Sequence, residues 1–137
     1  MIVDLEEKEV AGTFELKGGG KVHLRLRNEK DEKEIRAVCV SEVTEYPLLK
    51  DPVTGKEDYR PFTHEKTDTD RRLEMSWDRN ITGWDDLFDK NEKPIPVTKG
   101  NKVLLMTRVP EFLQAVMDGI KALMEKEKAK AKAAEKN

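Results

Sequence analysis

The feature that most constrains the fold of this 137-residue chain is an apolar stripe between residues 109 and 124. Its apolar side chains recur at spacings of three and four, which is typical of an amphipathic helix that packs one face against a core. Pro110 suits the first turn of such a helix, where no amide hydrogen is needed. The stripe consists of Val109, Phe112, Leu113, Val116, Met117, Ile120, Leu123 and Met124.

The stripe stops at Met124, and the residues that follow are of a different kind. The sequence EKEKAKAKAAEKN at 125–137 is rich in strong helix formers but has no apolar face. It predicts either a solvated extension of the same helix or a frayed tail. We therefore expect a single domain over residues 1–124, followed by a charged helical extension or tail over 125–137.

A second constraint is the alternation of apolar and polar residues on both sides of three consecutive glycines. This period of two predicts a β-hairpin over residues 12–27 with one buried face. The glycines at 18–20 supply the positive φ that a tight reversal needs. A glycine run that cradles a phosphate would precede a helix, whereas a strand follows here, so the pattern favours a turn. The buried face would carry Phe14, Leu16, Val22, Leu24 and Leu26.

The pattern is weaker between residues 31 and 64. Residues 31–46 have apolar side chains at helical spacing after an acidic start, which predicts a helix, although the β-branched segment AVCV disfavours it. Residues 47–64 contain three prolines and the turn sequence DPVTG, so they predict a loop-rich insert. Within the insert, Tyr59 and Phe62 are expected either to cover the core or to belong to a short hairpin.

Further helices are expected in the second half of the chain. One should begin at the TDTD segment, residues 67–70, because Thr67, Asp68 or Thr69 would cap it. Gly83 indicates that regular structure ends before Trp84. A polar turn is expected at 89–94, and Thr98 would cap a short helix that holds Val103, Leu104 and Met106. The fold class is therefore α+β, with an N-terminal hairpin or small antiparallel sheet packed against a mainly helical body that has a long C-terminal helix.

The composition limits the kinds of partner and the cellular compartment that we expect for this protein. The chain is 39% charged, with 26 basic and 28 acidic residues, and its net charge of -2 gives no support to nucleic-acid binding. No apolar run approaches the roughly 20 residues of a membrane span, and no secretory signal is visible. The single cysteine, Cys39, allows no intrachain disulfide. We expect a soluble, intracellular protein in which this thiol is reduced and half-buried.

Side chains capable of chemistry lack the patterns that chemistry requires. His23 and His64 have no acidic or histidine neighbour at metal-ligand spacing, so each is expected to be solvated or hydrogen-bonded. Asp85, Asp86 and Asp89 lack the alternation and the glycine of a calcium loop. They also lie in a polar turn, which offers no apolar pocket for an acid–base pair, so surface carboxylates are the favoured interpretation.

Nucleophiles and anion sites have equally little support. Neither serine at positions 41 and 76 lies in a nucleophile elbow, Cys39 has no visible activating base, and no nucleotide fingerprint occurs. Lys21, Arg25 and Arg27 form a basic strand face that an acidic balance elsewhere makes an ordinary solvated face rather than a phosphate site. The sequence therefore predicts no catalytic, cofactor-binding or metal-binding residue and no enzyme activity.

Partner binding is the remaining class of function, and adaptable apolar side chains are its candidates. Methionine is frequent on surfaces that bind varied partners, although it is more often part of a core. The candidate partner-binding residues are Met75, Trp84, Met106, Phe112, Met117 and Met124.

The stretch from residue 79 to residue 123 resembles the C-terminal signature of a family of small tailed-phage and prophage proteins, the tail assembly chaperones and chaperone-like proteins. In that family a segment similar to I-x-x-W-x-x-(L/V) precedes a turn, then P-(I/L)-P-x-T-x-x-N-K-x-x-L, then a helix similar to P-x-F-x-x-x-V. The likeness extends unevenly over residues 15–124. The matching positions are Ile81, Trp84, Leu87, Pro94, Ile95, Pro96, Thr98, Asn101, Lys102, Leu105, Pro110, Phe112 and Val116.

The resemblance implies a non-enzymatic protein in the cytoplasm of the bacterial host that helps to build a phage tail. Its expected partner is the tape measure protein or the tail tube protein, with no nucleic acid, membrane or cofactor involved, and self-association is left open. A minor structural component of the tail or neck is the alternative, and a small metal-dependent hydrolase using Asp85, Asp86 or Asp89 is a second. On the first interpretation, Trp84 is a packing anchor and the motif builds the fold.

Overall fold

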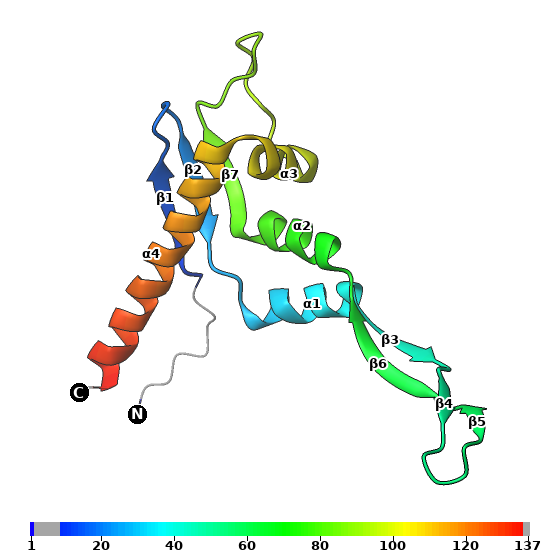
Figure 1. The fold of residues 1–137 in the computed structure, drawn as a ribbon. Coiled ribbons are helices and arrows are strands. Elements are labelled where there is room, and N and C mark those ends of the chain that lie inside the picture. Colours follow the sequence, from blue (N-terminus) through cyan, green and yellow to red (C-terminus); the bar gives the residue numbers. More distant parts are fainter. Residues whose placement is uncertain (2–8, 136–137) are drawn as a thin grey trace.

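A computed structural model describes residue 1 and residues 9–135 of the chain (Figure 1). Three antiparallel strands form one sheet in the order β1 (Ala11–Glu15), β2 (Lys21–Arg25) and β7 (Ile81–Asp85). The long helix α4 (Pro110–Glu135) lies across β1 and β2. This arrangement confirms the α+β class, with an N-terminal hairpin packed against helices and a long C-terminal helix.

The core lies between the sheet and α4. Val22 and Leu24 on β2 and Ile81 on β7 are almost completely buried, and Phe112 and Val116 of α4 pack against them. The helix approaches the sheet closely at Gly119, where a Cβ atom would lie 2.6 Å from Leu24 Cδ1. Glycine is therefore required there for space rather than for a special backbone conformation.

The predicted hairpin is confirmed in its strands and in its turn. Glu15 pairs with Lys21, and Ala11 pairs with Arg25 at the other end of the ladder. Gly19 and Gly20 have φ values of 92° and 94°, so two of the three glycines adopt the left-handed conformation that other residues avoid. The turn interpretation of the glycine run is therefore correct.

Helix α1 (Glu29–Cys39) is shorter than the helix predicted over 31–46. It begins at a capping box, in which the Asn28 side chain accepts from the Asp31 amide and the Asp31 carboxylate accepts from the Asn28 amide. The chain then turns directly into strand β3 (Val40–Glu45). The prediction of helix over 40–46 was wrong, because cross-strand pairing of this β-branched segment overrides its helical spacing.

Residues 40–67 form a projecting arm, of which the sequence predicted only a short hairpin within 47–64 as one alternative (Figure 1). Strand β3 pairs with β6 (Phe62–Thr67), and β4 (Leu48–Lys50) pairs with β5 (Glu57–Tyr59) beyond them. Gly55, with φ 70°, lies in the terminal turn. The insert at 47–64 is thus a hairpin, and Tyr59 and Phe62 stay exposed instead of covering the core.

Helix α2 (Thr69–Asn80) returns the chain from the arm to the sheet. Its N-cap is Asp68, one of the three predicted caps, whose carboxylate accepts from the Arg71 amide at 3.2 Å. The helix ends at Asn80, and the following residues enter the sheet as β7. The expectation that regular structure ends before Trp84 was wrong, because Gly83 is part of this buried strand.

The last third of the chain agrees with the sequence. A turn at 89–94 is closed by the Asp89 amide, which donates to the Lys93 carbonyl at 2.9 Å. Thr98 caps α3 (Lys99–Arg108), and α4 follows from Pro110. Helix α4 continues to Glu135, so the charged segment is helical as far as it is described, and residues 136–137 lie outside the described part. Residues 2–8, where a secretory signal was sought, also lie outside it.

None of the helices in the described residues combines the length and the hydropathy that crossing a lipid bilayer requires.

Candidate partner-binding surfaces

Three of the six predicted partner-binding residues lie in the core. Trp84, Met106 and Phe112 are all less than a tenth exposed. The Trp84 indole nitrogen donates to the Ile95 carbonyl at 2.8 Å, and its ring meets the Phe112 ring edge-on at a centroid distance of 5.9 Å. These side chains hold the 86–98 loop and α4 to the sheet, so they have almost no surface to offer to a partner.

The motif between residues 79 and 123 makes polar contacts that are structural. Thr98 Oγ1 accepts from the Asn101 amide at 3.1 Å, and the Asn101 side chain donates to the Pro96 carbonyl at 2.9 Å. The buried Lys102 ammonium donates to the Asp78 carbonyl and carboxylate, both at 3.1 Å, and so ties α3 to α2. The motif therefore builds the fold of this segment.

The remaining three candidates lie nearer the surface. Met75 is half-buried between α1 and α2, with its sulfur 3.6 Å from the thiol of the buried Cys39. Met117 is 58% exposed and Met124 is 48% exposed. Both belong to α4, which was expected to turn its whole apolar stripe to the core.

The apolar stripe of α4 is in fact divided between the core and the solvent. Phe112, Val116 and Leu123 face the sheet, whereas the other apolar residues lie to one side of them. We call this second row the helix flank. Ile120 is its partly buried member, and the row as a whole consists of Val109, Leu113, Met117, Ile120 and Met124.

A shallow hollow continues the helix flank at its N-terminal end. It has a volume of about 300 Å³ and is lined by the 89–96 loop and by the junction of α3 and α4. Leu104 and Val109 contribute exposed apolar surface to it, and Ile95 forms part of its wall. Asp89 and Arg108 are its charged lining residues. The hollow and the helix flank together form an apolar track on one side of the body.

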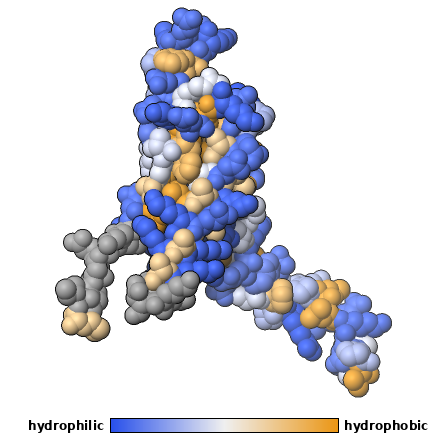
Figure 2. Space-filling view, turned by 90° about the vertical axis from the view of Figure 1, so that its left-hand side faces the viewer, coloured by the Kyte–Doolittle hydropathy of each residue, from blue (hydrophilic) through white to orange (hydrophobic). Residues whose placement is uncertain are grey.

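The arm carries a second group of exposed apolar side chains. Apolar residues are visible along the body and again near the end of the arm, surrounded by hydrophilic ones (Figure 2). Val53, in the terminal turn, is 90% exposed. A two-stranded hairpin without a covering layer is only marginally stable in water. The exposed apolar residues of the arm include Tyr46, Leu48, Leu49, Val53, Tyr59 and Phe62.

Polar contacts fix the arm at its base. The Asp68 amide donates to the Cys39 carbonyl at 2.8 Å, and Arg36 on α1 forms an ion pair with Glu65 on β6 at 2.6 Å. His64 Nε2 lies 3.4 Å from Glu45 Oε2 across the two strands. Because α1 enters the arm and α2 leaves it, two packed helices hold its base while its end stays free (Figure 1).

A row of polar side chains crosses the three-stranded sheet at His23, the other histidine considered in the sequence. Thr13 Oγ1 lies 2.8 Å from His23 Nδ1, and His23 Nε2 lies 2.8 Å from Asp85 Oδ2. The three types match a hydroxyl–imidazole–carboxylate triad, but Asp85 is 60% exposed and the row lies on the open face of the sheet. A triad works in a water-excluded site with oxyanion donors. Here the row links β1, β2 and β7, and confirms that His23 is hydrogen-bonded.

Of the other two carboxylates in the hydrolase alternative, Asp89 has structural hydrogen-bond partners. Asp89 Oδ1 accepts from the amides of Asn91 and Lys93 at 2.8 and 3.1 Å, so it closes the turn. Asp86 has a φ of 58° at the exit of β7. Over residues 9–135, no three His, Cys, Asp or Glu side chains form a group able to hold a metal ion.

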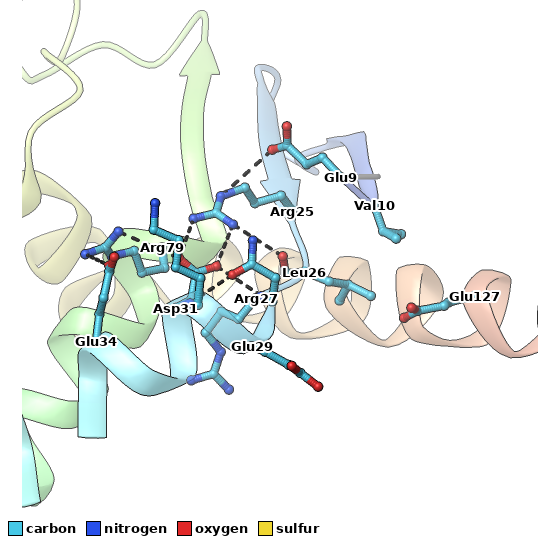
Figure 3. Close-up of a pocket in the computed structure, with 12 residues that line it drawn as sticks. Glu9, Val10, Arg25, Leu26, Arg27, Glu29, Asp31, Glu34, Arg79 and Glu127 are labelled. Atoms are coloured by element: carbon cyan, nitrogen blue, oxygen red, sulfur yellow. Dashed lines mark hydrogen bonds and ion pairs between the residues drawn. The ribbon is translucent and has the colours of Figure 1, made fainter. Parts of the chain in front are cut away.

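A charged pocket of about 680 Å³ lies where the hairpin meets α1 and α2 (Figure 3). Asp31, only 4% exposed, receives both terminal nitrogens of Arg25 at 2.7 and 3.2 Å. Arg79 Nη1 lies 3.7 Å from Asp31, and its Nη2 contacts Glu34 at 2.7 Å. The expectation of a solvated basic face holds for Lys21 and Arg27, which are exposed, although Arg27 also contacts Glu32 and Ser76. It is wrong for Arg25, which pairs with the buried Asp31.

The ion cluster changes the titration of its members. The Arg25 guanidinium, through its hydrogen bonds, holds the pKa of the Asp31 carboxyl below its usual value against the opposing effect of burial. The Asn28 amide and the charge of Arg79 act in the same direction. The same pairing raises the pKa of Arg25. The pocket is therefore a neutralised structural joint that holds α1 against the hairpin, and not an anion site.

The arm is the functional candidate that reasoning from sequence missed. Three features of the sequence indicated strands here. They are the β-branched residues of VSEVTE at 40–45, the turn residues of DPVTG, and large apolar residues among charged ones. What no local pattern revealed is that these strands pair with each other and not with the main sheet. The Asp51 carboxylate, which accepts from the amides of Val53 and Thr54, organises the turn.

Comparison of this chain with known protein families, curated proteins and solved structures finds no match.

Proposed function

We propose that this protein is a non-enzymatic assembly factor of a phage or prophage tail, a chaperone that binds the tape measure protein or the tail tube protein. The single observation that carries its protein-binding character is the projecting arm with its exposed aromatic and aliphatic side chains. The assignment to a phage tail rests on the motif between residues 79 and 123.

The distribution of chemical groups supports binding over catalysis. Asp85 and His23 are bonded across strands, Asp89 closes a turn, and the charged pocket is neutralised by its own ion pairs. By contrast, large apolar side chains stand in water on the arm. Exposed apolar surface of this kind marks sites that other proteins cover. The natural location of such a factor is the cytoplasm of the bacterial host, where tails are assembled.

In the mechanism that follows, the factor covers apolar surface of the client and so prevents its aggregation. The free end of the arm reaches beyond the body, so it can contact parts of an aggregation-prone client that lie away from the body. The charged surface of the rest of the chain, which is 39% Asp, Glu, Lys and Arg, keeps the complex soluble. Release of the factor from a finished tail requires moderate affinity, which suits a small contact surface.

The test is co-expression of the full chain with the tape measure or tail tube protein encoded beside it. We expect the client to become soluble and to co-purify. The matched variant replaces Leu49, Val53 and Tyr59 with serine, all of which are exposed, so its fold should be retained. Failure of the wild-type chain to bind either client would overturn the proposal, as would full binding by the arm variant.

A minor structural component of the tail or neck is the second candidate. The observation that favours it is the same arm, because projecting hairpins also suit permanent contacts between neighbouring subunits. Mass spectrometry of purified virions separates the two. A chaperone is absent from finished particles, whereas a structural component is present in a fixed ratio to the tube protein.

A further inference from the structure

The helix flank of α4 has the spacing of a coiled-coil seam. Leu113, Met117, Ile120 and Met124 are separated by four, three and four residues, which is the a/d spacing of two helices packed side by side. Within this seam Leu113, Met117 and Met124 are exposed, so the seam has no full partner among the described residues. From Leu113 to Met124 it runs for about 17 Å at the rise of an α-helix.

Lysines border the seam on its solvent side. Lys121, Lys128 and Lys132 are spaced seven and four residues apart, so they share one face of the helix beside Met117 and Met124. No ion pair joins these three lysines to any side chain in the described part of the chain. Glu125 lies among them, which still leaves this border positive.

The acidic residues elsewhere on α4 do not cancel the border. Asp118 accepts from the Gln114 side chain at 2.8 Å, on the side of the helix away from the seam. Glu127 lines the charged pocket together with Arg25. The seam is therefore apolar, with a basic edge toward the solvent and the protein core on its other side.

We propose that the helix flank binds an amphipathic helix of a client protein whose apolar stripe is bordered by glutamate or aspartate. This inference rests on the proposed function and adds to it the site and the chemistry of the partner. Acidic residues on the partner helix meet Lys121 and Lys128, while its apolar residues fill the spaces between Leu113, Met117 and Met124. The hollow beside Leu104 and Val109 receives an apolar side chain from one end of that helix.

Charge favours such a client over a second copy of this chain. A symmetric dimer through the helix flank would place the same surface on both sides of the contact. The lysine border of one copy would then face the lysine border of the other, and like charges across an interface oppose association. A client helix with an acidic border meets no such repulsion.

The test uses the full chain and two synthetic helical peptides of about 18 residues, long enough to cover the seam. Both carry the same apolar stripe, one bordered by glutamate and the other by lysine. Fluorescence anisotropy should show binding of the glutamate peptide, at least about tenfold weaker binding of the lysine peptide, and weakening of the first with added salt. Equal binding of both peptides, or of neither, would overturn the proposal.

Variants locate the binding. M117E and M124E each change an exposed residue and should weaken binding of the glutamate peptide about tenfold or more, whereas L73E, at an exposed position on α2, should leave it unchanged. The double variant K121E/K128E should reverse the preference between the peptides. Thermal melts confirm that each variant is folded. Unchanged binding by both methionine variants would place the site elsewhere, and sedimentation that shows a dimer lost in M117E would favour self-association instead.

Two failures are distinguishable. If co-purification with the tail client succeeds while M117E and M124E leave it intact, the flank proposal falls and the proposed function stands. If the peptides bind as expected but neither tail client does, the flank is a helix-binding site in a protein with another role.

Discussion

The body and the arm are built from the same kinds of residues but are stabilised in opposite ways. In the body, the strands β1, β2 and β7 are covered by α4, and Val22, Ile81 and Val116 are completely inaccessible to solvent. In the arm, each strand has only one pairing partner and no covering layer, and apolar residues such as Val53 and Phe62 are exposed to water. The backbone pairing is antiparallel in both.

The difference in covering indicates that the body supplies the stability of the chain and that the arm serves its function. Burial of apolar surface against α4 supplies the folding free energy of the body, whereas the arm adds hydrogen bonds of modest net value. The arm contributes little to stability and exposes apolar side chains to water, which is unfavourable. We therefore expect it to bind another molecule. We therefore regard the arm as the region in which substitutions should affect partners more than folding.

The largest expected contrast is between two phenylalanines. F112A removes a fully buried ring that packs against Trp84, so it should lower the free energy of unfolding by about 3–5 kcal/mol. F62A removes an exposed ring of the arm, and the cost should stay within about 0.5 kcal/mol. Urea unfolding of both variants measures the contrast. Similar losses for the two would show that the arm is part of the cooperative core.

The ion cluster between the hairpin and α1 gives the next effect. D31N leaves the partly buried Arg25 without its carboxylate partner and should cost about 3 kcal/mol at neutral pH. Because the folded pKa of Asp31 lies below its unfolded value, its contribution is complete above about pH 5 and is lost as the pH falls through the folded pKa.

Thermal melts between pH 3 and pH 7 follow this dependence. We expect the melting temperature of the wild-type chain to drop more steeply below about pH 5 than that of D31N. K33N is a suitable control, because Lys33 is exposed on the same helix and has no ion pair to a described residue. Parallel curves for the wild type and D31N would mean that the pair contributes nothing to acid sensitivity.

The close approach of α4 to the sheet can be tested with two glycines. The Cβ of G119A would lie 2.6 Å from Leu24 and 2.9 Å from Phe14, and we expect a net loss of about 1–2 kcal/mol despite alanine's better helix propensity. In α3, G100A meets nothing within 4 Å and should stabilise the chain by about 0.5–1 kcal/mol. Opposite signs are expected in denaturant melts, and a gain in both would show that α4 has room to move.

Removal of the outer part of the arm should have only a small effect on stability, although it deletes many residues. Glu45 and Phe62 are register partners, so Asn-Gly in place of residues 46–61 closes the arm with a two-residue turn. We expect the melting temperature to change by only a few degrees, while client binding is lost. Collapse of the fold would erase the distinction between arm and body, and retained binding would contradict the assignment of client binding to the arm.

Much of the body was predictable because its signals are local. The alternation around the glycines specified the hairpin, the Thr98 cap and Pro110 specified the starts of α3 and α4, and Trp84 was correctly interpreted as a packing anchor. Each of these depends on residues only a few positions apart. Of the predicted partner-binding residues, only Met117 and Met124 lie on an exposed surface, because a helical stripe does not reveal how much of its width the core will cover.

By itself, the sequence determined the α+β class, the hairpin and the helix boundaries near the C-terminus, since turn chemistry, caps and periodicity act over one or two turns of chain. The tertiary structure decided three further features. Residues 40–45 leave the helix to pair with 62–67, residues 81–85 join the sheet beside β2, and Arg25 is joined to a buried Asp31. The first two depend on pairs of strands whose register partners are 17 to 64 residues apart in the chain, and the third depends on a helix that packs against those strands. No local pattern encodes such a partner, because pairing and burial are settled by whichever distant surfaces lower the free energy of the whole chain together.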